Sequence, residues 1–190
     1  MAMQQGGAIY YDLYRPYMSN NKFQNNEALY GNNIASYPVK IRLKDSESDD
    51  IILNDAPSGQ VYSPTLQFEL VDHDNQVISI DNTSSVSIKA IDTNASVRGF
   101  AQSVVNEGLA NFDQLILQAK PGSQNIEIEI SSLALDLNKL SLQYNKTFNQ
   151  SFIQASFRYC QSGEIERNGV CEVCSPGLYS LGVNKTECLN

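Results

Sequence analysis

The chain is poor in several residue types, and its shortage of basic residues and of long apolar runs excludes two classes of partner. It contains no tryptophan, one histidine, and 13 lysines and arginines against 21 aspartates and glutamates. The net charge of -8 repels nucleic acid and anionic lipid, and the basic residues are scattered, so neither is an expected partner. No apolar run is long enough to span a membrane, and residues 1–5 are not a signal peptide. A secreted protein with this sequence would therefore be part of a longer chain, and any membrane contact would come from parts outside it.

Cysteine is absent before position 160. The four cysteines, Cys160, Cys171, Cys174 and Cys188, follow the spacing C-x10-C-x2-C-x13-C. The short separation of Cys171 and Cys174 suits a zinc site. The alternative is two short disulfide loops, Cys160–Cys171 and Cys174–Cys188.

The residues around the cysteines favour the disulfides. Between residues 161 and 190 the turn formers NG and SPG interrupt a stretch with few apolar side chains, and the only histidine lies far away at position 73. Such a segment cannot fold by burial, and each disulfide loop would contribute about 3 kcal/mol. Disulfides persist outside the reducing cytosol, so the predicted location is extracellular or at the cell surface.

The middle of the chain alternates apolar and polar residues, which is typical of half-buried strands. The clearest case is "IEIEI" at residues 126–130. Further strands are expected within 39–44, 66–70, 77–80, 86–90, 97–105, 112–119 and 153–159. A turn at residues 72–75 predicts a hairpin over 65–80, and residues 133–140 suit one helical turn or a crossover. Short strands with turns at each break predict an antiparallel, immunoglobulin-like β-sandwich.

The first 36 residues follow another pattern. "GGAI" at residues 6–9 is followed by the similar "GNNIA" at residues 31–35, with paired asparagines between them. Short apolar strands that recur at a period in the twenties are typical of one coil of a parallel β-helix. The asparagines would lie at turns, where their amides bond to the coils above and below. We therefore expect the last coil of a longer β-helix.

The order of these parts resembles a known family. "GGAIYYDLYRPYMSNNKFQNNEALYGNNIASYP", then a β-rich segment, then "FRYCQSGEIERNGVCEVCSPGLYS" resemble the large cysteine-rich surface proteins of ciliates and related protists. The first stretch is similar to the β-helix repeats of polymorphic outer membrane proteins, and the last to ephrin-receptor-like and tumour-necrosis-receptor-like repeats. The resemblance covers nearly the whole chain, although the tail stops after its fourth cysteine. It implies an extracellular array, often followed by membrane spans, with no known catalytic residues.

These observations predict an all-β protein of three domains. Residues 1–36 would be the terminal coil of a parallel β-helix, residues 37–159 the β-sandwich, and residues 160–190 a small disulfide-rich module. The expected partners are neighbouring modules of the same longer chain, and other surface proteins or glycans.

Five N-x-S/T sequons make the chain a candidate glycoprotein, and their number is roughly twice that expected by chance. They lie in or beside predicted turns, which suits an exposed surface. The candidate acceptors are Asn82, Asn94, Asn145, Asn149 and Asn184.

Other residues are weaker candidates for a site. The acidic loops at 44–50 and 72–75 lack the glycine and terminal glutamate of a calcium-binding loop, and we expect solvated turns. His73, at the tip of the predicted hairpin, is expected to be exposed and inert. The N-terminal tyrosines form either a binding face or the packing between the coil and the sandwich. They are Tyr10, Tyr11, Tyr14, Tyr17, Tyr30 and Tyr37.

The sequence thus predicts a non-catalytic spacer, cap and presentation segment of a larger cell-surface protein. No catalytic residue, cofactor or metal ligand is expected. A ligand-binding receptor or adhesion ectodomain is the first alternative. A polysaccharide-active β-helix enzyme is the second, for which one coil offers only Asp12, Arg15, Lys22 and Glu27 as acidic and basic groups.

Overall fold

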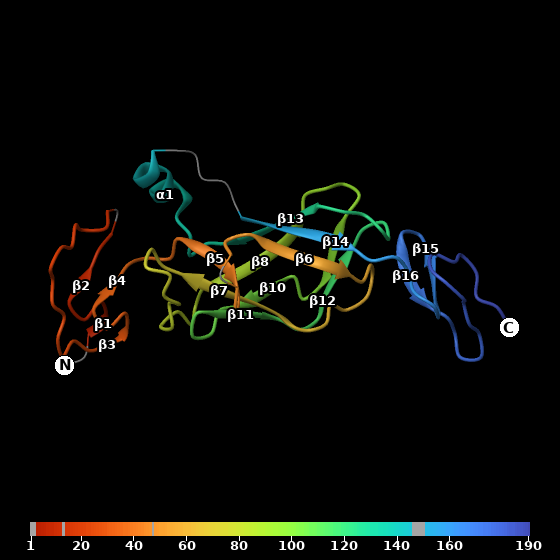
Figure 1. Ribbon diagram of the computed structural model, residues 1–190, viewed down its shortest axis with the longest axis horizontal. Coiled ribbons are helices and arrows are strands. Elements are labelled where there is room, and N and C mark those ends of the chain that lie inside the picture. Colours follow the sequence, from red (N-terminus) through yellow and green to blue (C-terminus); the bar gives the residue numbers. More distant parts are fainter. Residues whose placement is uncertain (1–2, 13, 47, 146–150) are drawn as a thin grey trace.

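The computed structural model describes residues 3–12, 14–46, 48–145 and 151–190. Within these ranges the protein is nearly all-β, as predicted. Figure 1 shows an elongated molecule with the chain termini near opposite ends. We call residues 3–36 the N-terminal part, residues 37–159 the central part and residues 160–190 the C-terminal part.

The N-terminal part contains two pairs of short parallel strands. β1 (Met3–Gln5) pairs with β3 (Ala28–Tyr30), and β2 (Ile9–Tyr10) pairs with β4 (Ile34–Ala35). The sequence step between partners is the same in both pairs, with Gln5 opposite Tyr30 and Ile9 opposite Ile34. We call this constant step the coil repeat. The chain therefore completes one turn and begins a second in the same register, at the spacing seen in the sequence.

Glycine permits this close stacking at three positions. Gly6 and Gly31 are one coil repeat apart and both have φ of +61°, a conformation that glycine adopts without strain. A Cβ atom on Gly7 would lie 2.2 Å from the carbonyl oxygen of Asn32.

In the described part of the chain, the asparagine amides do not bond between stacked turns, although the sequence had led us to expect this. Where the structure gives them a partner, as between Asn26 and Asn33, the bond joins residues close in sequence rather than positions one turn apart.

The central part contains a five-stranded sheet in the order β10-β8-β13-β14-β6. Its strands are β6 (Ile51–Ala56), β8 (Ser85–Ala90), β10 (Gln102–Val104), β13 (Ile126–Ser132) and β14 (Ser151–Phe157). β14 pairs with β6 in parallel, so the antiparallel prediction is wrong for this pair and the sheet is mixed. β6 was not expected from the sequence, because an acidic loop precedes it and only its first three residues and Ala56 are apolar.

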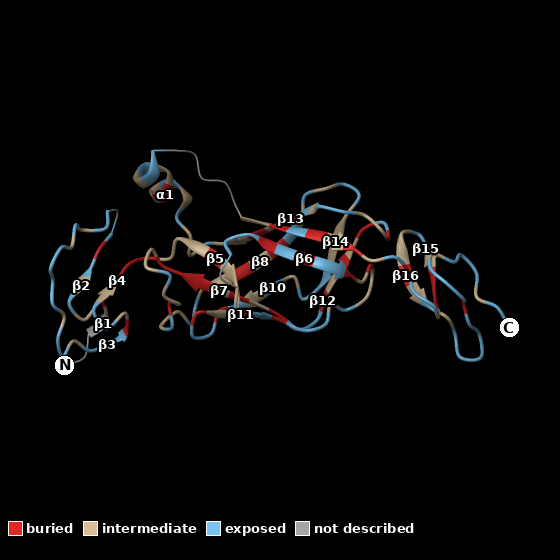
Figure 2. Cartoon of the chain, viewed as in Figure 1, coloured by how far each residue is buried: buried red, intermediate tan, exposed pale blue. Residues whose placement is uncertain are grey.

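The rest of the central part comprises a three-stranded antiparallel sheet, β11-β7-β5, and the pair β12-β9. These strands are β5 (Lys40–Leu43), β7 (Leu66–Val71), β9 (Ser96–Gly99), β11 (Leu109–Phe112) and β12 (Leu115–Gln118). Side chains from both sheets and from β12 form one buried cluster, in which Phe68 and Phe112 pack edge to face. Figure 2 shows buried residues concentrated along these strands.

The predicted hairpin over residues 65–80 is wrong in its second strand. Val77 forms only an isolated bridge with Val71, and residues 72–76 make a tight loop after β7. The physical reason is competition, because β5 and β11 already occupy the two edges of β7.

The helix α1 (Leu137–Tyr144) begins within the leucine-rich stretch 133–140, for which one helical turn or a crossover was expected. Its N-cap is Asp136, whose side chain accepts a hydrogen bond from the amide of Lys139, and the left-handed Asn145 ends it. Only Leu140 of the helix is buried.

The C-terminal part contains the hairpin β15 (Glu164–Arg167) and β16 (Val170–Val173). Asn168 and Gly169 join the strands, and both have positive φ, as a two-residue hairpin turn requires. This turn was expected from the sequence, whereas the short strands beside it were not.

Candidate functional site: two junctions flanking the central part

Two disulfides lie in the C-terminal part. The first disulfide joins Cys160 to Cys171 with an S–S distance of 2.04 Å, and the second joins Cys174 to Cys188 at 2.06 Å. These are the pairs expected from the sequence. No described cysteine is free, which leaves no thiolate for the alternative zinc site.

The first disulfide is buried at the junction between β14 and the hairpin β15–β16, which we call the C-terminal junction. Ser58 connects the parts there, because its hydroxyl, which has one hydrogen to donate, lies within hydrogen-bond distance of the carbonyl of Ala119 and, at 3.0 Å, of that of Gly169. The amide of Cys171 donates in turn to the carbonyl of Ser58. These bonds satisfy buried polar groups on both sides, so the hairpin is held against the central part.

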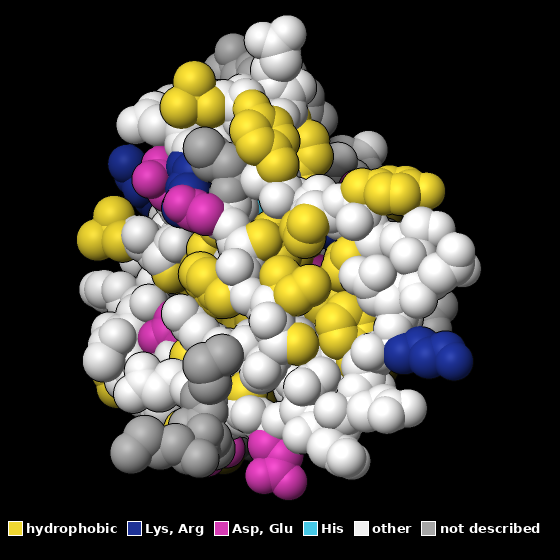
Figure 3. Space-filling view, turned by 90° about the vertical axis from the view of Figure 1, so that its left-hand side faces the viewer, with side chains coloured by type: hydrophobic (Ala, Val, Ile, Leu, Met, Phe, Trp, Pro, Cys, Tyr) yellow, Lys and Arg dark blue, Asp and Glu magenta, His cyan; other side chains and the backbone are white. Residues whose placement is uncertain are grey.

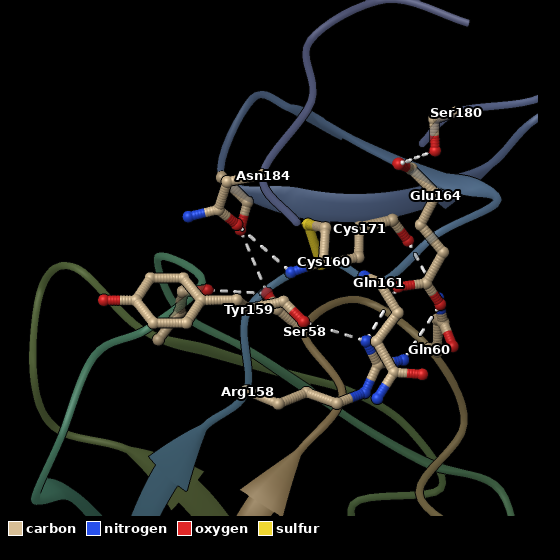
Figure 4. Close-up of a disulfide and its surroundings, with 12 residues drawn as sticks. Ser58, Gln60, Arg158, Tyr159, Cys160, Gln161, Glu164, Cys171, Ser180 and Asn184 are labelled. Carbon is tan, nitrogen blue, oxygen red and sulfur yellow. Dashed lines mark hydrogen bonds and ion pairs between the residues drawn. A yellow bond between two sulfur atoms is a disulfide. The ribbon is translucent and has the colours of Figure 1, made fainter. Parts of the chain in front are cut away.

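An ion pair crosses the same junction (Figure 4). Arg158, just after β14, contacts both carboxylate oxygens of Glu164 at 2.7 and 2.9 Å. Glu164 is 9 % exposed and also accepts bonds from the side chain of Gln60 and the amide of Gln161. The hydrogen bonds from Arg158 lower the pKa of Glu164 to about 2, and burial acts in the opposite direction. The charged pair is therefore fully formed at neutral pH.

The second disulfide lies in a more exposed region. Cys174 and Cys188 are half-buried. The loop that they close carries Leu178, Leu181 and Val183, which are all exposed. The two disulfides therefore differ in role: the first closes the C-terminal junction, and the second closes a surface loop.

A second junction joins the central part to the N-terminal part, whose two pairs of stacked strands we call the coil. Residues 72–76 form the centre of this junction. We call it the N-terminal junction. The carboxylate of Asp72 is fully buried and accepts the hydroxyl of Tyr30, the amide of Asp74, and the amide and side chain of Gln76. Asp74 accepts Tyr11 and pairs with Arg15 at 2.8 Å. The prediction that this acidic loop is a solvated turn is wrong, because its side chains bind the coil.

His73 was expected to be exposed and inert, and the structure contradicts the exposure. Its ring stacks on Tyr11, meets Tyr37 edge-on and lies 5.9 Å from the ring of Tyr144. The hydroxyl of Tyr144 is 2.9 Å from Nδ1 of His73, and Nε2 is buried without a hydrogen-bond partner among the described residues. Burial lowers the pKa of His73, although the negative charges of Asp72 and Asp74 act against this shift.

The loop at residues 72–76 and the residues directly after it cover one edge of the coil. The side chain of Gln76 donates to the carbonyl of Ile34 at 2.9 Å, and the hydroxyl of Ser79 donates to that of Leu29. Ile78 packs with Tyr30 in a small buried cluster. Side chains thus take the place of a further strand beside β3 and β4. Within the described residues, β1 and β2 pair only with β3 and β4, so their outer edge has no strand partner.

Three of the six N-terminal tyrosines pack between the coil and the central part, and the other three are exposed. Tyr11, Tyr30 and Tyr37 are buried at the N-terminal junction. Tyr10, Tyr14 and Tyr17 are exposed, and Tyr17 retains 92 % of its surface. Figure 3 shows hydrophobic side chains gathered on the end of the molecule that carries the coil, with few charges around them.

Two of the four coil residues named as candidates for a polysaccharide-active enzyme form ion pairs with other parts of the chain. Asp12 pairs with Lys139 of α1, and Arg15 pairs with Asp74. Lys139 also lies 4.2 Å from the centre of the Tyr37 ring, which is the position of a cation–π contact. Burial, aided by the charge of Asp12, raises the pKa of Tyr37 to about 12. The other two candidates, Lys22 and Glu27, are exposed.

The sequons differ in surroundings. Asn82, Asn94 and Asn145 are exposed in turns or at the end of α1. Asn184 is half-buried, and its side-chain oxygen accepts the amide of Cys160 (Figure 4). Asn149 lies outside the described residues.

The described residues contain no group of three or more His, Cys, Asp or Glu side chains arranged to hold a metal ion. In the same ranges, no helix is long and apolar enough to cross a membrane.

A groove of about 490 Å³ lies between α1 and the end of the five-stranded sheet. Leucines from residues 133–140 and serines from β8 and β13 line it.

No family model, curated protein or solved structure matches the chain. The two junctions and the open edge of the coil are therefore the features of the described structure that bear on function.

Proposed function

We propose that the chain is a non-catalytic structural and interaction segment of a larger extracellular or cell-surface protein. In this proposal it spaces neighbouring modules, caps a β-helix and presents a stapled C-terminal end. Residues 1–36 would be the terminal coil of the β-helix, residues 37–159 an immunoglobulin-like sandwich, and residues 160–190 a cysteine-rich module.

The observation that carries the proposal is the difference between the two edges of the coil. Gln76 and Ser79 cover the edge formed by β3 and β4. The edge formed by β1 and β2 has no such cover in the described structure. An uncovered strand edge readily recruits another strand. The coil repeat defines the register that a preceding coil would take.

The C-terminal junction supports the spacer role. Arg158 and Glu164 form a two-point contact, and a disulfide lies beside it. A short hairpin with so few buried side chains would otherwise move freely, so these links transmit orientation from the central part to the C-terminal part. The two disulfides also support an oxidising location.

Duplication of one coil tests the capping role. A second copy of residues 3–27 is inserted before Met3, and hydrogen exchange is measured at the backbone amides of β1 and β2. We expect these amides to become protected, because the inserted strands pair with them one coil repeat away. A matched insertion carrying Gly7→Val should give no protection, since this side chain would strike the backbone of the coil below. Equal exchange in the original chain and the duplicated one would refute the capping role.

The location has its own test. Protein taken from its native source is denatured without reduction and its thiols are titrated. We expect no reactive thiol. Four thiols per chain would place the native protein in a reducing compartment and refute the extracellular assignment.

The alternative of a ligand-binding or adhesion ectodomain is favoured by the exposed Tyr14 and Tyr17, because tyrosine gives contact area at little entropic cost. A glycan and protein array separates the two proposals. One saturable partner, lost in Tyr14→Ala/Tyr17→Ala, would favour the ectodomain.

A further inference from the structure

His73 is the only histidine of the chain, and it lies where three separate segments meet. Tyr11 comes from the coil, Tyr37 from the linker that follows β4, and Tyr144 from the end of α1. The amide of His73 also donates to the hydroxyl of Ser36 across the N-terminal junction. One titratable ring therefore contacts the coil and two separate segments of the central part.

We propose that the N-terminal junction is an acid-sensitive switch, which neutral His73 holds closed and protonated His73 opens. The geometry favours a neutral ring, because three aromatic rings pack against the half-buried His73 and reduce the water that would solvate a charge. Nδ1 lies within hydrogen-bond distance of the Tyr144 hydroxyl, and buried Nε2 has no partner in the described residues. The side chain of Gln143, which favours the protonated ring, already accepts the hydroxyl of Tyr37 at 2.6 Å. A second proton would therefore add a charge whose hydrogen-bonding help from Gln143 is shared with Tyr37.

The charged neighbours do not remove this penalty. Asp72 already accepts four hydrogen bonds, and Asp74 is engaged by Tyr11 and Arg15. Burial lowers the pKa of His73 and outweighs the two negative charges, which favour the protonated ring. A cavity of about 360 Å³ beside the ring gives protons a route from solvent. The titratable and charged groups around the junction are Asp12, Arg15, Asp72 and Asp74, with Tyr11, Tyr37 and Tyr144, Lys139 of α1, and Lys40 and Asp49 across the cavity.

The sign of the pH dependence follows from this shift. The pKa of His73 in the folded state lies below that of the unfolded chain, where histidine titrates near about 6.5. The junction is therefore fully stable above about pH 6.5 and loses stability as the pH falls through the folded pKa. The C-terminal junction behaves differently, because Glu164 keeps its charge down to a pKa of about 2. Mild acid should release the coil and leave the C-terminal part in place.

The test uses the full chain and two NMR measurements. The imidazole signals of His73 are titrated in the folded protein and in urea, where a single histidine leaves no ambiguity of assignment. We expect a lower pKa in the folded protein. Hydrogen exchange at the amide of His73, corrected for the intrinsic effect of pH, should become severalfold faster at pH 5 than at pH 7.5. Exchange at the amide of Cys171, at the C-terminal junction, should not change between these conditions.

His73→Phe is the matched variant, because it keeps an aromatic ring between the tyrosines and removes the titration. Exchange at the amide of residue 73 should then be the same at both pH values. The proposal is overturned if the folded pKa equals or exceeds that of the unfolded chain, or if His73→Phe keeps the full acid response. The titration needs no variant, so a folding defect in His73→Phe would not hide the answer.

Discussion

Glu164→Gln isolates the charge at the C-terminal junction, because it keeps the shape of the side chain. Glu164 is almost fully buried and contacts Arg158 through both oxygens. The amide oxygen of glutamine can accept one of these bonds, but its NH₂ group would face the guanidinium. The variant therefore leaves the half-buried Arg158 with one of its two bonds to residue 164, beside its bond to the carbonyl of Tyr159.

The size of the effect follows from the pKa of Glu164, which falls from an ordinary 4.5 to about 2. A shift of this size corresponds to about 3 kcal/mol of stability at neutral pH. Because one hydrogen bond survives, we expect the variant to lose about 2 kcal/mol, which is roughly a thirtyfold change in an opening equilibrium. In the wild-type chain the same stability is present above about pH 4.5, the unfolded value, and is lost as the pH falls towards 2.

The assay is hydrogen exchange at the amide of Cys171, which donates across the junction to Ser58. Glu172→Gln is the matched control, because it removes an exposed ion pair with Arg167 on the same hairpin. Such surface pairs contribute about 0–1 kcal/mol, so exchange in the control should change little. Equal exchange rates in Glu164→Gln and the wild type would refute the reasoning, since the buried charge would then contribute nothing to docking.

Three further predictions concern the rest of the fold. Replacement of both cysteines of the first disulfide by alanine should cost about 3 kcal/mol and expose the C-terminal junction to proteolysis. The same change in the second disulfide should open only its own loop, as mass spectrometry of the fragments would show. Asp72→Asn should cost about 2–3 kcal/mol in urea unfolding, whereas Asp74→Asn, at a partly exposed site, should cost about 1 kcal/mol or less. Gly122→Ala should lower the melting temperature more than Gly163→Ala. Both glycines have φ of +85°, but only a Cβ on Gly122 meets the ring of Tyr159, at 2.3 Å. Intact junctions after loss of the first disulfide, equal costs at the two aspartates, or equal melting of the glycine variants would contradict the respective argument.

Local patterns predicted much of the fold. The alternation in residues 126–130 gave β13, and the strand before Cys160 is β14. The spacing of the two glycine-led stretches predicted the register of the coil, because stacked turns place equal sequence positions opposite each other. The NG turn and the disulfide pairs likewise follow from residues close together in the chain.

The junctions could not be predicted in this way, since each depends on residues far apart. Asp72 meets Tyr30 over 42 positions, and Gln60 meets Glu164 over 104. A loop of polar residues reads as solvated until the coil lies against it, and His73 reads as exposed for the same reason. The missed β6 and its parallel pairing with β14 also required knowledge of which edge of the sheet was free.

The sequence by itself determined the elements that depend on near neighbours, namely the alternating strands, the turns, the disulfide loops and the repeat of the coil. The tertiary structure alone decided which polar residues became buried. Asp72, His73 and Glu164 occupy positions that any turn or short strand could expose to water. Asp72 and Glu164 are buried, and His73 is half-buried, because the coil and the hairpin pack against the ends of the central sheets. The two buried carboxylates then require partners that only this packing supplies.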